Sequence, residues 1–175
     1  DYRDMADMVL VWNGFKPVTM IELSYFWHRG FSKTKFLCKV GELEKILKQL
    51  GLCYKLHLNY PKSHKEITKY SLVAKKQNIL SELMAAEKEK SNRRRRVKIG
   101  SLLGYPKTAV TAFSRGESIN RRDLPPSVQQ SDDLKFLNFS MSKHWRKEMA
   151  YLGKKAKTLE KFIPGLYIKI LKGRG

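Results

Sequence analysis

Hydrophobic spacing in the first half of the chain changes from helical to strand-like. Apolar residues recur at intervals of three and four over residues 41–50, which predicts the end of a helix. Gly51 follows where a left-handed residue would stop that helix, and Leu52 supplies the apolar contact of such a cap. Over residues 53–60 the pattern becomes alternating, which predicts a strand with an apolar face made of Tyr54, Leu56, Leu58 and Tyr60.

A second strand and another helix are predicted to follow. Residues 61–64 have the sequence Pro-Lys-Ser-His, which favours a turn, and residues 66–75 are expected to return as a strand. From Gln77 the spacing is helical again, with an inner face of Ile79, Leu80, Leu83 and Met84. Residues 1–87 are therefore expected to hold helices and a hairpin. The chain as a whole is predicted to have an α+β fold, predominantly helical with a small antiparallel β-hairpin.

The last third of the chain is predicted to be a loop followed by basic helices. Residues 117–140 are rich in Ser, Pro, Asp and Gln, which favours a long loop. Ser142 is expected to cap the next helix, which Pro164 and Gly165 would end, within a C-terminal basic part spanning residues 142–172. The apolar stripe of that helix, expected to face the core, consists of Trp145, Met149, Leu152, Ala156, Leu159 and Phe162.

The sequence is expected to form a single domain, residues 1–175, and its charge predicts the kind of partner that it binds. The chain has 36 Lys and Arg against 16 Asp and Glu, a formal net charge of +20, while 42% hydrophobic residues suffice for a core. Residues 51–100 hold 13 basic and 4 acidic side chains, net +9, whereas residues 1–50 hold 8 and 6, net +2. Such a protein is best understood beside a polyanion, with nucleic acid ahead of an anionic membrane face. The longest apolar run, residues 8–12, is far below the roughly 20 residues of a membrane span, so no membrane partner is expected.

Cysteine and histidine usage argues against metal or cofactor chemistry. Cys38 and Cys53 are not in a CxxC arrangement and are interpreted as small apolar core residues of a reducing compartment, cytoplasmic, nucleoid or nuclear. The four histidines have no metal-ligand spacing, and no phosphate-binding or nucleotide-binding glycine loop is present. We therefore expect no metal and no cofactor, and the sequence favours a binding protein over an enzyme.

The segment 88–98 is the most basic stretch of the chain. It contains Arg93, Arg94, Arg95 and Arg96 in succession, followed by Lys98. A solvated helix face, a loose linker or a localisation signal would each account for such a run. Arginine at all four positions favours a phosphate-contacting arm, because each guanidinium can direct two donors at one phosphate group.

The segment 96–116 carries the most specific pattern. Gly100 is a small residue where two helices would touch, Gly104 suits the positive φ of a tight turn, and Val110 would lock the second helix onto the first. Pro106 suits the first turn of the second helix, where its missing N–H needs no partner. The other buried positions are expected at Ile99, Leu103, Tyr105 and Phe113. In these residues the segment resembles the helix-turn-helix of lac-repressor and lambda-repressor type proteins, although two core helices meeting at a Gly-Pro turn would give the same pattern.

The resemblance implies a recognition helix over residues 106–115. Lys107, Thr108, Thr111 and Arg115 would then point away from the core, where these residue types contact base edges, methyl groups and phosphates. Further basic residues of the second half extend the predicted surface. The complete set of candidate nucleic-acid-binding residues is Arg93, Arg94, Arg95, Arg96, Lys98, Lys107, Thr108, Thr111, Arg115, Arg121, Arg122, Lys143, Arg146, Lys147 and Lys154.

A second resemblance leads to a different hypothesis. The Leu-Gly-Tyr-Pro motif that ends at Pro106, with Val110 and Phe113 after it, is similar to an uncharacterised prokaryotic family whose motif continues with two cysteines. Thr108 and Ala109 stand at those cysteine positions, so a thiol or metal role is not implied for this chain. The sequence favours a DNA-binding protein over an RNA-binding or ribonucleoprotein component. The remaining alternative is a small-molecule enzyme, in which Lys107, Thr111 and Arg115 would converge on a concave surface.

Overall fold

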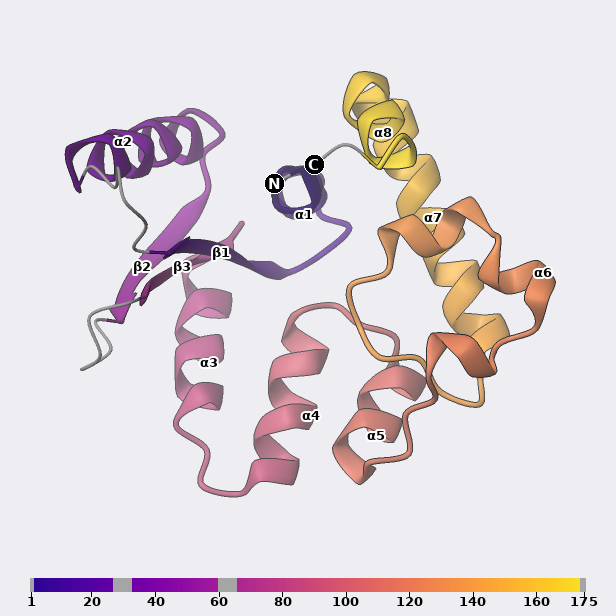
Figure 1. Cartoon of the computed structure of the whole chain (residues 1–175). Helices are drawn as coiled ribbons and strands as arrows, with labels where there is room; N and C mark the ends of the chain where they lie inside the picture. Colours follow the sequence, from indigo (N-terminus) through magenta and orange to yellow (C-terminus); the bar gives the residue numbers. More distant parts are fainter. Residues whose placement is uncertain (1, 27–32, 60–65, 174–175) are drawn as a thin grey trace.

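The computed structural model describes residues 2–26, 33–59 and 66–173. The turn predicted at residues 61–64 lies outside the described residues. Figure 1 shows the elements in order along the chain. They are α1 (Tyr2–Asn13), β1 (Val18–Phe26), α2 (Lys33–Gln49), β2 (Cys53–Asn59), β3 (Glu66–Ala74), α3 (Gln77–Glu87), α4 (Asn92–Leu102), α5 (Lys107–Arg115), η1 (Arg121–Asp123), α6 (Pro126–Gln129), η2 (Asp132–Phe136), α7 (Trp145–Phe162) and α8 (Pro164–Leu171).

The described strands form a three-stranded antiparallel sheet in the order β1-β3-β2. The predicted strands 53–60 and 66–75 are present as β2 and β3, and β1 pairs with the other side of β3, with Met20 opposite Leu72. The predominantly helical α+β fold is thus confirmed, and the sheet has one strand more than the predicted hairpin. The predicted helix end is also confirmed: Gly51 has φ +64°, and the N–H of Leu52 donates to the carbonyl of Leu47 at 2.9 Å.

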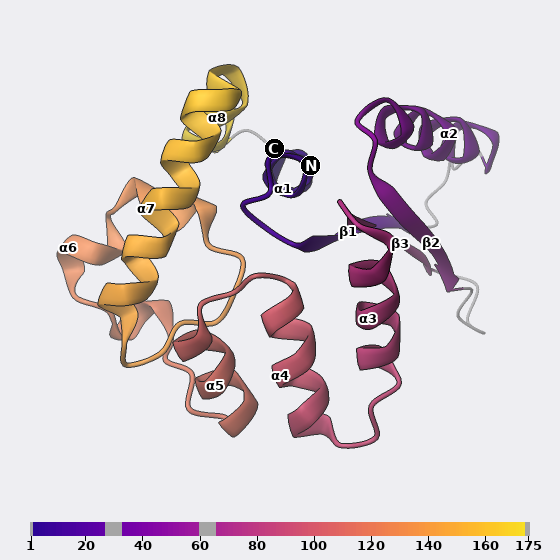
Figure 2. The same cartoon turned by 180° about the vertical axis from the view of Figure 1, so that it is seen from behind.

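Helices cover both faces of the sheet, as the alternation of side chains along a strand requires. On one face, Val73 packs with Leu47 of α2 and Val11 of α1. On the other face, Leu72 packs with Leu80 and Leu83 of α3, two of the residues predicted to face inward. Figures 1 and 2 show α3 next to the sheet, α4 beside α3, and α5 beside α4 on the side away from the sheet.

Helix α1 contributes to two separate hydrophobic clusters. Its Val11 belongs to the cluster of the sheet and α2, whereas Ala6 and Leu10 pack with Leu159 of α7 and Ile170 of α8. In both views α1 is seen end-on between α2 and α8. This helix therefore joins the sheet to the C-terminal helices.

Four local predictions about the helices, loop and cysteines are wrong. The predicted loop 117–140 contains η1, α6 and η2, because Leu124 and Leu134 are buried in a cluster of their own. Phe162 was predicted to face the core with the rest of the apolar stripe of α7, but it lies in the last turn of that helix and is 44% exposed. Helix α7 is capped at His144 rather than Ser142. Cys38 is exposed on α2, whereas Cys53 packs against the core as expected.

Candidate nucleic-acid interface and buried charge cluster

The turn between α4 and α5 has the local geometry that its glycines predict. A Cβ at Gly100 would lie 2.9 Å from Cγ2 of Val110, so only glycine lets the two helices approach this closely. Gly104 has φ +73° in the turn. Pro106 is the residue that precedes α5, with ψ 133°, and therefore stands one position before the first turn in which it was predicted. The prediction of two helices locked at Gly100 and Val110 is confirmed; their assignment as a DNA-binding helix-turn-helix stays a prediction.

One of the predicted buried positions in this hairpin is wrong. Ile99, Leu103 and Tyr105 are partly buried, but Phe113 is 46% exposed. Helix α5 buries Ala109, Val110 and Ala112, which turns Phe113 towards the outside. The guanidinium of Arg96 lies over its ring, 5.1 Å from the centroid, at the distance of a cation–π contact.

The four arginines form the start of α4, which we call the arginine turn (Arg93–Arg96). Ser91 caps the helix by accepting a hydrogen bond from the N–H of Arg94 at 3.4 Å, so this segment is a helix rather than a linker. Among the described residues none of the four arginines forms an ion pair, and the first turn of α4 contains no acid. Positive side chains at the positive end of a helix dipole are unfavourable for the helix. Glu89, which precedes α4, interacts electrostatically with Arg94, but the turn as a whole keeps an excess of positive charge.

Helix α5 presents its other face to a groove of about 540 Å³. Lys107 and Arg115 are exposed along one wall, and Thr111 lies half-buried between them. Lys143 and His144 form the opposite wall, just before α7 begins. One acid, the exposed Glu117, also lines the groove, so Lys107, Arg115 and Lys143 leave it with an excess of positive charge. We call this feature the basic groove. Its concave shape differs from the protruding helix expected for reading a major groove.

The walls of the basic groove are joined by a buried carboxylate. Glu148, in the first turn of α7, is fully buried. It accepts hydrogen bonds from the Thr108 hydroxyl at 2.7 Å, the Ser142 hydroxyl at 2.5 Å and the Ser142 N–H at 2.8 Å. Thr108 was predicted to face a ligand, but its hydroxyl is used to hold α5 against α7. Ser142 was predicted to cap α7 and instead binds this acid.

The remaining candidates are spread around this region and several already have partners. Lys98 pairs with Glu89 at 2.7 Å, and this hydrogen bond lowers the pKa of the Glu89 carboxyl. Arg121 donates to the carbonyl of Gln129 at 3.0 Å, and the guanidinium of Arg146 lies 4.4 Å from the ring centroid of Trp145. These three residues are exposed, and so are the last three candidates, Arg122, Lys147 and Lys154.

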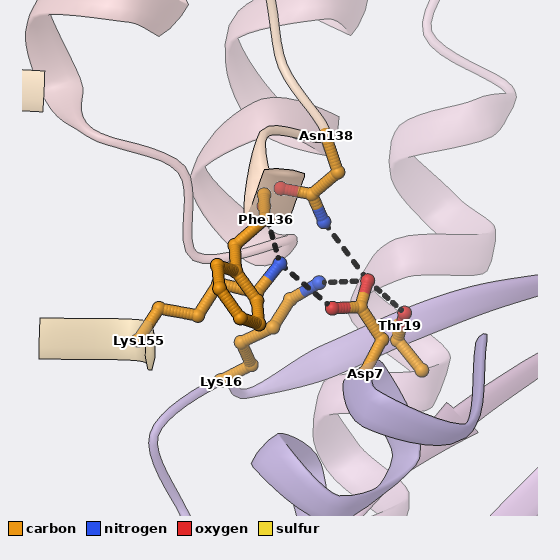
Figure 3. A network of polar contacts seen from close by, with 6 residues as sticks. All are labelled: Asp7, Lys16, Thr19, Phe136, Asn138 and Lys155. Carbon is orange, nitrogen blue, oxygen red and sulfur yellow. Dashed lines mark hydrogen bonds and ion pairs between the residues drawn. The ribbon is translucent and has the colours of Figure 1, made fainter. Parts of the chain in front are cut away.

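A second charged site, which the sequence analysis missed, lies between α1 and α7. Asp7 accepts hydrogen bonds at Oδ2 from Lys16 at 2.7 Å, Thr19 at 3.2 Å and Asn138 at 2.9 Å, and Oδ1 lies 3.1 Å from Nζ of Lys155 (Figure 3). Lys155 also donates to the carbonyl of Phe136 at 3.1 Å. We call Asp7, Lys16 and Lys155 the buried charge cluster. The available signal was Asp7 itself, which stands three and four residues before buried Leu10 and Val11.

Burial and charge act in opposite directions on the pKa values in this cluster. Burial alone would raise the pKa of Asp7, but the ammonium groups of Lys16 and Lys155 outweigh it and hold that pKa below its usual value. For Lys155, desolvation outweighs the attraction to Asp7 and lowers the pKa. Burial beside Asp7 raises the pKa of Tyr105 to about 12. The carboxylate is therefore charged at neutral pH and holds two cations in place.

A cavity of about 330 Å³ lies beside the cluster and includes Asp7, Thr19 and Lys155 in its lining. In the described part of the chain no group of His, Cys, Asp or Glu side chains is arranged to hold a metal ion. Within the same residues no helix is long and apolar enough to cross a membrane. Comparison with protein-family models, with curated proteins and with solved structures finds no match to this chain.

Proposed function

We propose that the protein binds nucleic acid through the arginine turn and the basic groove. The observation that carries this proposal is that the arginine turn has four adjacent cations and no acid in the first turn of its helix. Lys16 and Lys155 in the buried charge cluster, by contrast, are paired with Asp7. Exposed guanidinium groups in this arrangement bind phosphates, and release of counterions from nucleic acid supplies the free energy.

The basic groove supports the same partner. Lys107 and Arg115 come from α5, and Lys143 comes from a segment that Glu148 fixes beside that helix. A concave basic groove suits one phosphate backbone, whereas a duplex DNA reader needs α5 to protrude into the major groove. The shape of the groove therefore favours RNA or single-stranded DNA, and we add these to duplex DNA as candidate ligands.

The small-molecule enzyme is the weaker alternative. Lys107, Thr111 and Arg115 do line a concave surface, as that hypothesis requires. An enzyme would need a hydroxyl activated by a carboxylate, and beside the groove the hydroxyls of Thr108 and Ser142 both donate to Glu148. However, Glu148 and Ser142 are buried. A buried pair that holds two helices together is not accessible for attack on a substrate.

A binding titration over a series of salt concentrations tests the proposal. Duplex DNA, single-stranded DNA, structured RNA and heparin are compared, and the log–log slope for nucleic acid is expected to be about −4 to −8. Replacing Arg93–Arg96 with Ala should flatten the slope by about two units. The matched control replaces four exposed lysines far from the arginine turn with Ala, and it should change the slope much less. These lysines are Lys45, Lys48, Lys55 and Lys75. A flat salt dependence, or equal effects of the two variants, would contradict the proposal.

A further inference from the structure

An apolar pocket of about 250 Å³ lies between α4 and α5, on the side of α5 opposite the basic groove. Its lining comes from both helices and from the segment before α7, and includes Ile99, Leu103, Tyr105, Val110, Phe113 and Phe139. The volume is below the roughly 300–1,000 Å³ of pockets for drug-sized ligands. The pocket therefore suits one flat apolar group rather than a complete cofactor.

The mouth of this pocket combines an exposed aromatic ring with arginine. Phe113 is 46% exposed, and Arg96 lines the pocket with its guanidinium over the Phe113 ring. Arg93 precedes Arg96 by three residues and lies on the same side of α4, one turn nearer the start of the helix. Apolar surface for a ring and cations for a phosphate thus lie next to each other.

We infer that this pocket binds a nucleobase that is turned out of the stack of a single-stranded nucleic acid. The base takes the place of the Arg96 guanidinium on the Phe113 ring and packs against Phe113 and Tyr105. Arg93 and the displaced Arg96 then contact the phosphates on either side of the base. Aromatic side chains beside a basic track are how proteins bind single strands without sequence preference, because every base has an aromatic face. A base inside a duplex is stacked on both sides and cannot enter, so the inference deepens the proposed function and rests on it.

The test uses the full chain and three probes: a single-stranded DNA, its duplex, and a strand with the same phosphates whose bases are replaced by abasic sites. We expect Phe113→Ala to weaken binding of the normal single strand about tenfold or more, the effect of losing one stacked base. Binding of the abasic strand should be unchanged, because its phosphates still meet the arginines. Phe113→Trp should retain affinity for the normal strand.

Phe162 provides the matched control. It is 44% exposed on α7 and lies under the ammonium group of Lys161, 5.6 Å from the ring centroid, but it is not in the lining of the pocket. Phe162→Ala should leave all three affinities unchanged. If Phe113→Ala affects the normal and abasic strands equally, or neither, the pocket does not bind a base.

Photocrosslinking gives a second measurement that does not depend on a variant folding. A single strand carrying 4-thiothymidine should crosslink to the tryptic peptide 108–115, which contains Phe113, and the duplex should not. Crosslinks found only elsewhere would overturn the inference. Salt-dependent binding without these crosslinks would leave the proposed function standing, whereas loss of all salt-dependent binding would remove both.

Discussion

The buried charge cluster and the arginine turn are two ways of using positive charge in one molecule. In the cluster, two ammonium groups share the carboxylate of Asp7, and Lys16 is only 1% exposed. In the arginine turn, at the positive end of a helix, Arg93, Arg94 and Arg96 are exposed. Arg95 is half-buried and donates to the side chain of Asn92 at 2.5 Å, and among the described residues no carboxylate forms an ion pair with any of the four. Buried charges must be paired and hydrogen-bonded to be tolerated, whereas exposed ones contribute little to stability. The first site therefore holds the fold together, and the second remains available for a ligand.

The largest expected effect is that of removing the central acid of the cluster. Asp7→Ala should lower the free energy of unfolding by about 3–5 kcal/mol, because it leaves two buried ammonium groups without a counter-charge. Urea denaturation at neutral pH measures this change. The matched control is Asp132→Ala, which breaks a pair of the same 2.7 Å length with Lys135 at the surface. That variant should change stability by less than about 1 kcal/mol, and similar losses in both would remove the distinction between the two kinds of site.

Lowering the pH should cause part of the same loss of stability in the unmodified protein, because it protonates Asp7. The carboxyl has a pKa below its usual value in the folded state, so its stabilising contribution is fully present above the unfolded value of about 4. That contribution is lost as the pH falls from there through the lower folded pKa. Unfolding free energies measured from about pH 5 to about pH 2 should decline more steeply for the parent than for Asp7→Asn, which cannot titrate at this position. Parallel pH profiles would show that Asp7 is not held ionised by its lysines.

The smallest effect on stability is expected in the arginine turn. Replacing Arg93–Arg96 with Ala should leave the free energy of unfolding within about 0.5 kcal/mol of the parent or raise it slightly, because four cations leave the positive end of α4. Thermal and urea unfolding of the variant used in the binding titration give this value directly. A loss of several kcal/mol would mean that the arginines stabilise the fold, and the comparison with the buried charge cluster would fail.

Local periodicity was sufficient to predict the elements whose pattern is complete within one segment. The end of α2, the strands β2 and β3, and the close approach of Gly100 to Val110 were all correct, because spacing and glycine conformation are local properties. The loop predicted over residues 117–140 failed for the opposite reason. Its turn-forming composition is real, but Leu124 and Leu134 are buried by contacts with α7 that lie outside any local window.

The candidate site was predictable only in part. Exposed cations can be located from composition, and Lys107 and Arg115 are exposed as expected. The partners of Thr108 and Asp7 could not be derived, since Glu148 lies 40 residues from the first and Asn138 lies 131 residues from the second. Pairings at such separations depend on how the helices pack in three dimensions, which no local pattern specifies.

The position of α1 between two hydrophobic clusters has a consequence for synthesis on the ribosome. Ala6 and Leu10 are buried by residues 159–170, and Asp7 needs Lys155. At a translation rate of about 5–20 residues per second, the first helix leaves the ribosome on the order of ten seconds before these partners exist. During that interval its apolar face stays uncovered and its carboxylate has only the nearby Lys16. Helix α1 can therefore complete its packing only after α7 and α8 have been synthesised.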